Sequence, residues 1–422
     1  MNLVSELDLP VFDYNTPGFL ADTYHVQLAT LRTQSGWLAR GVADRALVYL
    51  VLDHDAAEFF LRAQETAFPG REIVTCSRIN AGFVVDAGPL AEYIDANILN
   101  LSGEQHRRLR AVAGQAFGPR AADRWRPVMR GFLTQLWARI GAYGECDFVP
   151  AVARPYPSLT IATVLGAPHR DAGRLHEWSS LLQRQFDIRA LEANLPQIER
   201  AVKEAEAYIS TLIADRRADP GNDLTSTDLT STDLTSTDLI STLSAAGLSD
   251  AECVSLVVNL LAGGIDTTAS QLAHAIRLFA LHPAQWGLLA ERPALAAAAV
   301  DEVLRFEPAI PFTARICRTD LCYRDVLFPA GTILAICAER ANREGDDGER
   351  FSITAPRAGR LLTFGAGPHH CLGANLARAE LEEALAFLAP RMVSLRLNGP
   401  PRFGRVEGIY GMDKLLITWS GS

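Results

Sequence analysis

The sequence lacks paired cysteines and any spacing typical of a zinc site. Its seven cysteines are scattered and odd in number, and no two of them form a Cys-x-x-Cys pair. They stand at positions 76, 146, 253, 317, 322, 337 and 371. Because disulfides are rare where thiols are kept reduced, a cytoplasmic location is the simplest expectation.

Excess positive charge and a membrane-spanning segment are also missing. Forty basic residues stand against 49 acidic ones, for a net charge of −9, so we expect no nucleic-acid partner, although a local basic patch stays compatible with this total. The longest apolar run, residues 254–265, is interrupted by Asn259 and is too short to span a bilayer. The acidic N-terminal segment is broken by Pro10, which is not typical of a signal peptide or anchor. We therefore expect no membrane association.

The chain contains enough apolar residues for one large core, with 48% hydrophobic residues among 422. Two short runs at 37–42 and 46–52 predict a hairpin, followed by a helix capped by Asp53, and residues 323–333 predict another hairpin. Further helices are expected over 19–34, 125–143, 176–188 and 197–217. Residues 66–95 show no sustained period and predict a loop.

A pentad repeat, Leu-Thr-Ser-Thr-Asp, occurs three times over residues 224–238. Five is neither a helix nor a strand period, and Thr, Ser and Asp favour turns and caps. We interpret residues 222–240 as a mobile surface-loop expansion without catalytic meaning, while a partner-binding role stays open.

The most informative stretch is Phe364-Gly-Ala-Gly-Pro-His-His-Cys-Leu-Gly373. Cys371 stands just before a predicted helix, whose dipole and free N–H groups would favour a thiolate. A buried structural cysteine in a glycine turn is the plainer alternative. The pattern resembles the haem-binding loop of cytochromes P450, and every specified position matches. The resemblance implies that Cys371 ligates haem iron and that Phe364, Gly365 and Gly373 contact the haem.

A second motif, Ala262-Gly-Gly-Ile-Asp-Thr-Thr268, lies inside a helix that Ser249 and Glu252 are expected to cap. Two adjacent glycines cost a helix about 1 kcal/mol each, which predicts a bend. A close helix-packing site is the alternative. The motif resembles the oxygen-activation motif of the same family. This implies that Gly263 contacts the cofactor, that Thr267 supplies a relay hydroxyl and that Asp266 is its proton source.

Basic residues form a third group. Ser102 is expected to cap a helix on which His106 and Arg110 share one face. This could be a solvated helix start, and Arg315 could be a strand-edge charge. By resemblance, these residues and His369 bind the haem propionates.

Glu302 and Arg305, three residues apart, could be an ordinary surface pair. By resemblance they form a buried structural ion pair, with Arg343, Arg350 and Arg357 as candidates for its third partner. Two departures from the family pattern are Glu344-Gly345 in place of Asp-Pro and Leu361 in place of histidine.

The resemblance also implies substrate contacts. Residues 66–95 would form the variable loop over the haem, and Ala309, Ile310 and Phe312 would line the pocket beside it. These apolar segments suggest a largely hydrophobic small-molecule substrate.

The resemblance implies a mainly α cytochrome P450 fold over residues 1–422, a helical prism with a small β-rich part at about 36–60 and 309–340. Haem b would be the cofactor, and dioxygen the source of the inserted oxygen. Electrons from NAD(P)H would arrive through a ferredoxin and its reductase, and natural-product biosynthesis is a compositional guess. Oxidative coupling, desaturation and, more remotely, a non-enzymatic haem sensor stay open as alternatives. The intact Asp266-Thr267 pair argues against peroxide-driven oxidation, because peroxide already carries its protons.

Overall fold

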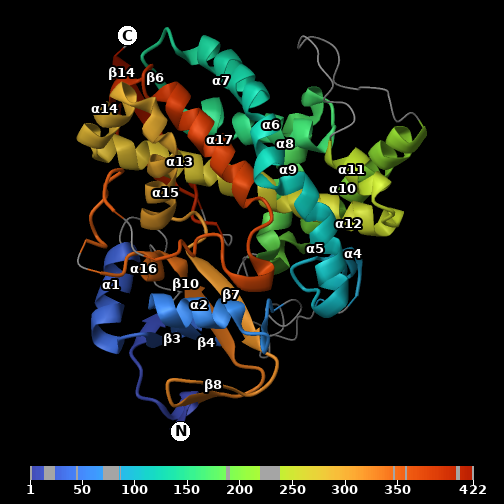
Figure 1. Cartoon of the computed structure of the whole chain (residues 1–422), viewed down its shortest axis with the longest axis vertical. Coiled ribbons are helices and arrows are strands. Elements are labelled where there is room, and N and C mark those ends of the chain that lie inside the picture. The colour runs from blue at the N-terminus through green and yellow to red at the C-terminus, as the bar shows by residue number, and fades with distance from the viewer. Residues whose placement is uncertain are drawn as a thin grey trace.

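The computed structural model describes residues 2–13, 24–43, 46–69, 85, 87–186, 191–218, 238–345, 347–356, 359–404 and 409–420. Most of the pentad repeat, Arg357 and residues 70–84 of the expected pocket loop lie outside these ranges. Figure 1 shows most helices gathered above a small β-rich part beside the N-terminus, with the C-terminus at the opposite end. This is the mainly α architecture expected from the sequence.

The largest sheet joins strands from both ends of the chain, in the order β2-β3-β4-β10-β7-β5. β3 and β4 form the expected hairpin, β10 pairs with β4 in parallel, and β7 pairs with β10 antiparallel. The bounds are β2 Val11–Asp13, β3 Leu38–Ala43, β4 Ala46–Val51, β5 Thr66–Ala67, β7 Phe312–Cys317 and β10 Ile333–Cys337. This sheet places β7, which carries Arg315, under the helical part.

Three smaller sheets complete the β structure, in the orders β1-β9-β8, β11-β14-β6 and β12-β13. The expected hairpin near 323–333 is β8–β9, closed by a turn in which Arg324 and Asp325 have φ of 46° and 63°. The bounds are β1 Asn2–Leu3, β6 Glu145–Asp147, β8 Leu321–Tyr323, β9 Val326–Phe328, β11 Val393–Leu397, β12 Arg402–Phe403, β13 Met412–Lys414 and β14 Leu416–Ser420.

Several helices begin within a residue of the predicted start, whereas α9 and α10 begin four and six residues before it. Their bounds are α1 Tyr24–Ser35, α2 His54–Arg62, α4 Pro89–Ala96, α5 Gly103–Phe117, α6 Pro119–Arg124, α7 Arg126–Ile140, α8 Pro155–Leu165, α9 Ala172–Gln183, α10 Leu191–Ala218, α11 Leu239–Ala245, α12 Asp250–Gly264, α13 Asp266–Leu281, α14 Pro283–Glu291, α15 Ala296–Phe306, α16 Ala338–Asn342 and α17 Ala374–Leu388. Helix α4 lies in the segment expected to be a loop. Its eight residues are too few to reveal a period, although Pro89 occupies the first turn, where proline is favoured.

The predicted caps have different outcomes. Asp53 accepts a hydrogen bond of 2.8 Å from the Ala56 amide, and Ser249 and Glu252 form a complete capping box. Ser102 takes the predicted N-cap position of α5 with an extended backbone, but its side chain makes no cap hydrogen bond.

The long helix through the centre is broken at Ile265, between α12 and α13. The combined stretch Asp250–Leu281 is long and apolar enough to cross a membrane by length and composition alone, and half of its apolar window is buried inside the protein. Helices α8, α9 and α10 pack against it, which is the environment of a core helix.

Candidate functional site

The cysteine loop is held by its own backbone and by α2. The Cys371 amide donates a hydrogen bond of 2.8 Å to the Phe364 carbonyl, and Gly365 and Gly367 have φ of 72° and 70°. A Cβ on Gly367 would lie 2.9 Å from the Leu61 carbonyl oxygen. Glycine is therefore required at 367 both by its dihedral angle and by the close approach of α2.

The Cys371 side chain is exposed toward a cavity between the loop and the broken helix. Burial raises the pKa of this thiol, while the amides of Gly373 and Ala374 and the charge of Arg110 act to lower it. The expected effect of the helix start is present, but desolvation outweighs it, so the expectation of a favoured thiolate is wrong for the protein alone. Binding to a metal ion would supply the missing driving force for deprotonation.

Four nitrogen-bearing side chains gather at the same cavity: His106 and Arg110 from α5, Arg315 from β7 and His369 from the loop. The His106 and His369 rings lie 4.3 Å apart between centroids. Burial lowers the pKa of Arg315 to about 10. Burial, together with the charges of His106, Arg315 and Arg110, lowers the pKa of His369 to about 3. Among the described residues, none of the four forms an ion pair with a carboxylate.

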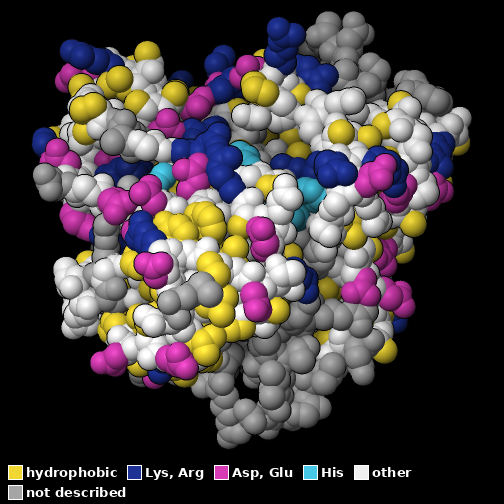
Figure 2. Space-filling view, turned by 60° about the horizontal axis from the view of Figure 1, so that its bottom comes forward, with side chains coloured by type: hydrophobic (Ala, Val, Ile, Leu, Met, Phe, Trp, Pro, Cys, Tyr) yellow, Lys and Arg dark blue, Asp and Glu magenta, His cyan; other side chains and the backbone are white. Residues whose placement is uncertain are grey.

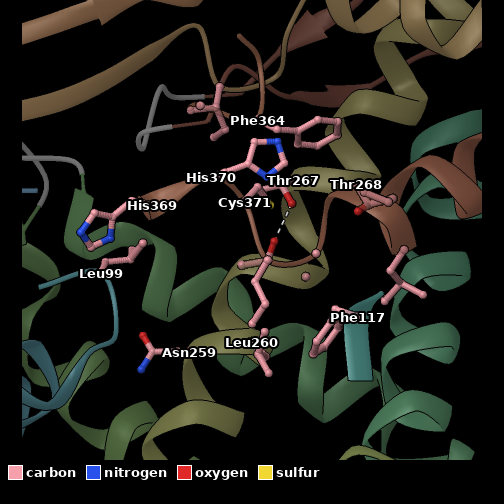
Figure 3. A pocket seen from close by; sticks show the side chains of 18 of the residues that line it. Leu99, Phe117, Asn259, Leu260, Thr267, Thr268, Phe364, His369, His370 and Cys371 are labelled. Atoms are coloured by element: carbon pink, nitrogen blue, oxygen red, sulfur yellow. Dashed lines mark hydrogen bonds between the residues drawn. The ribbon is translucent and has the colours of Figure 1, made fainter. Parts of the chain in front are cut away.

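This arrangement fits haem. Buried arginines without acidic partners are costly, and the two carboxylates of a haem would offset that cost. A Cβ on Gly263 or Gly373 would meet nothing within 4 Å, so both glycines leave open space at the cavity wall. Phe364 and Gly365 also line the cavity. The residues predicted to bind the cofactor are thus brought together by four separate elements. Figure 3 shows Phe364, His369 and Cys371 of this set.

The break in the central helix has a clear local cause. Thr267 Oγ1 donates a hydrogen bond of 2.6 Å to the Gly263 carbonyl, and Figure 3 draws this bond beside Cys371. A Cβ on Gly264 would lie 2.7 Å from Ile161 Cδ1 of α8. The second glycine therefore permits close packing on α8, and the threonine hydroxyl satisfies a carbonyl that the break leaves open. Both alternatives for the Gly-Gly pair, helix packing and a bend, are present.

Asp266 points away from the cavity, toward α9. Its carboxylate accepts hydrogen bonds of 2.6 Å from Ser179 and 2.9 Å from Ser180, and His176 Nδ1 lies 3.8 Å away. Asp266 does not line the cavity, whereas Thr267 does. The sequence reveals no partner for Asp266 because the contact joins segments about 87 residues apart, and nothing in α9 resembles a known motif.

Of the three expected pocket residues, Ala309 and Ile310 line the cavity. Phe312 does not, because side chains of a strand alternate between its faces, and Thr313 and Arg315 take the cavity side. Phe312 instead packs beside the apolar cluster of the β-rich part. Phe68, in the expected loop 66–95, lines the cavity, but the sequence missed several other lining residues that carry no motif: Ile98, Leu99, Phe117, Ile161, Val164, Asn259, Leu260 and Glu380. Asn259 was detectable, because it shares a helix face with Gly263 and Thr267.

Glu302 and Arg305 form a bidentate ion pair at 2.7 and 3.0 Å, with Glu302 2% exposed. Arg305 also donates to the carbonyls of Gly348 and Arg350, while the Ser352 amide donates to Glu302. Arg343 pairs with Glu339 instead. The pair therefore ties α15 to the segment before the cysteine loop and lies outside the cavity, in a structural position.

Comparison with known proteins agrees with these features. The family model of cytochrome P450 matches residues 85–285 and 284–388. Luteothin monooxygenase of Streptomyces thioluteus is 34% identical over 98% of this chain and 97% of its own length. Mycinamicin IV hydroxylase/epoxidase of Micromonospora griseorubida is 31% identical over 78% of this chain and 81% of its own.

Solved structures agree as well. CalO2 has a TM-score of 0.85 and 28% identity, covering 98% of this chain and all of its own. P450BioI, solved with a ligated acyl carrier protein, has a TM-score of 0.83 and 26% identity over 95% of this chain and all of its own. The chain belongs to the cytochrome P450 family, whose cofactor is haem iron, and is a monooxygenase of the bacterial type.

Proposed function

We propose that this monooxygenase inserts one oxygen atom of dioxygen into a largely hydrophobic small molecule, with haem b held by the cysteine loop. The observation that carries the proposal is that Cys371 and Thr267, on different elements, face one cavity whose wall also holds four basic or imidazole side chains. Cys371 would ligate the iron, and Arg110, Arg315, His106 and His369 would hold the propionates. When bound, haem supplies the activation of dioxygen.

The chain's own contribution would be proton delivery. The Thr267 hydroxyl faces the cavity and would pass a proton into it once its hydrogen bond to Gly263 is exchanged. Asp266 is the adjacent carboxylate and would take up a proton on the side that faces α9. Ser179 and Ser180 of α9 donate hydrogen bonds to this carboxylate. Movement of α9 would then connect the carboxylate to solvent and to the hydroxyl.

Electrons would come from NAD(P)H through a ferredoxin and its reductase. Helices α2 and α5 contact the cysteine loop, and on them Arg62 and Arg107 are exposed, as is Arg360 near α2. Figure 2 shows Lys and Arg side chains gathered in a band across one face of a protein whose net charge is negative. An acidic iron–sulfur protein would be attracted to such a band.

The substrate class is supported by the cavity and by the relatives. The described lining is mostly apolar, and several curated relatives are named for oxidations of luteothin, mycinamicins and erythromycin. A role in natural-product biosynthesis follows as the proposal. Five of the described cysteines are free thiols, which supports a cytoplasmic location: Cys146, Cys253, Cys317, Cys337 and Cys371.

The test uses the haem-loaded protein with a surrogate ferredoxin, its reductase and NADPH. Compounds would be selected by the shift of the haem Soret band and then incubated under ¹⁸O₂. One labelled oxygen atom in the product supports the proposal. A product that is desaturated or coupled without the label would favour the alternative reactions, and NADPH consumption no faster than in a boiled control would favour a non-enzymatic role.

A further inference from the structure

One polar side chain stands in an otherwise apolar part of the cavity. Asn259 lines it from α12, one turn before Gly263 and two turns before Thr267 on the same helix face. A helix rises about 1.5 Å per residue, so Asn259 lies about 12 Å from Thr267 along the helix direction. Figure 3 shows Asn259 and Leu260 at the opposite end of the pocket from Phe364 and Cys371.

Asn259 has polar neighbours in Tyr93 and Ser255, which do not line the cavity. The described cavity wall itself is mostly apolar and includes Phe68, Ile98, Leu99 and Leu260. The other amide in the cavity wall, Gln271, is committed at both ends, donating to the Glu307 carbonyl and accepting from the Ala309 amide. Asn259 also has partners for its oxygen and its nitrogen, so its capacity to bind a ligand depends on how well its second N–H is satisfied.

Its orientation is fixed by its neighbours. The Tyr93 hydroxyl of α4 donates a hydrogen bond of 3.2 Å to Asn259 Oδ1, and Asn259 Nδ2 donates one of 2.7 Å to the Ser255 carbonyl. A carbonyl can only accept, so the nitrogen cannot be exchanged with the oxygen. The second N–H of Nδ2 has only a long contact, 3.4 Å, to Ser255 Oγ.

That second N–H decides what the ligand must offer. An N–H without a good partner costs more than a carbonyl oxygen with one lone pair unused. A ligand would therefore satisfy the second N–H of Asn259 best with a hydrogen-bond acceptor. This acceptor can be an uncharged group.

We propose that Asn259 is a specificity-determining residue that binds a carbonyl oxygen of the substrate. The substrate is then an elongated, largely apolar molecule that carries this carbonyl about 12 Å from the carbon that is oxidised. This inference rests on the proposed function, because it takes the reacting end of the cavity to be the end that holds Cys371 and Thr267. The competing explanation is that Asn259 only connects α12 to α4 through Tyr93.

The experiment compares two matched probes, decanophenone and decylbenzene, which differ in a carbonyl replacing a methylene. Each is titrated into the haem-loaded protein, and the dissociation constant is read from the Soret shift. The ratio of the two constants, compared between wild type and Asn259→Leu, cancels the different solubilities of the probes. We expect the substitution to weaken binding of the ketone, relative to decylbenzene, about 5- to 10-fold, which is the range for one hydrogen bond.

Leu99→Ala is the control, because it enlarges the cavity without removing the amide and should leave the ratio unchanged. An unchanged ratio in Asn259→Leu, or a wild-type Soret band that does not respond to the ketone, overturns the proposal. If Asn259 only connects α12 to α4, its substitution lowers the melting temperature and weakens the binding of both probes by the same factor. The failure of the proposed function is separate, since it would appear as no labelled product under ¹⁸O₂ whatever the probe ratio.

Discussion

The Ser179 hydroxyl donates a hydrogen bond of 2.6 Å to Asp266 Oδ2, so that a carboxylate next to the cavity is held on its outer side by α9. If this carboxylate delivers protons, Asp266→Asn should lower turnover about 100-fold or more while leaving the Soret band unchanged. The amide oxygen can still accept a hydrogen bond from one serine, its NH2 group can only donate to the other serine's oxygen, and the side chain cannot take up a proton. The measurement is product formation with surrogate redox partners.

The matched control is the Ser179→Ala/Ser180→Ala double variant, which keeps the carboxylate and removes its two donors. It should retain at least about a tenth of wild-type turnover, given that general acid–base catalysis contributes about 100-fold or more. Equal losses in both variants would show that Asp266 serves only to hold α9.

Thr267→Ala should keep haem but divert reducing equivalents from product to hydrogen peroxide. The change removes the hydroxyl that faces the cavity and its 2.6 Å bond to the Gly263 carbonyl. Peroxide formed per NADPH consumed is the readout, and Thr267→Ser, which keeps the hydroxyl, should stay close to wild type. A fully coupled alanine variant contradicts the relay.

Cys371→Ala should abolish the ferrous–CO absorption band that marks a thiolate ligand, because no other described cysteine lines the cavity. Cys322→Ala is the control, since Cys322 is exposed on β8, away from the loop. If Cys371→Ala retains the band, Cys371 is not the ligand of the metal.

The pKa of His369, lowered to about 3, predicts an acid sensitivity of the haem-free protein. Between pH 6.5 and 3 the unfolded chain binds a proton at this residue and the folded one does not, so stability falls as the pH falls through that window. The midpoint of urea unfolding at pH 7 and pH 5 measures this effect. His369→Gln should show a smaller decrease, and an identical decrease would contradict the assignment.

Asp238, the last residue of the pentad repeat, caps α11 through the Ser241 amide at 2.8 Å and pairs with buried Arg216 at 3.3 Å. Asp238→Ala should therefore destabilise the protein by about 3–5 kcal/mol, the cost of leaving a buried charge unpaired. Asp228→Ala, in an earlier copy of the pentad, should have little effect on the melting temperature. Equal losses would contradict our interpretation of the repeat as a loop expansion.

The sequence predicted the parts of the site that lie within a single motif. The turn around Cys371, the bend after Gly263 and the face shared by His106 and Arg110 depend on residues a few positions apart, and each has the predicted form. Backbone preferences and helix geometry are sufficient for such features.

Features that join distant segments were not predictable. The contact of Ser179 with Asp266 and the face of β7 chosen by Phe312 depend on how the elements pack, which no local pattern records. The missing side-chain bond at Ser102 was not predictable either, because Asp53 and Ser249 have the same extended backbone and do make the bond.

The two neighbouring glycines of the broken helix differ in what they would tolerate. A methyl group at Gly264 would strike Ile161, whereas one at Gly263 would meet nothing within 4 Å. Alanine at position 263 would not force α8 aside, but its methyl group would enter the space in which the cofactor is expected to lie. At position 264 the methyl group would instead meet the end of the Ile161 side chain, which would have to rotate aside.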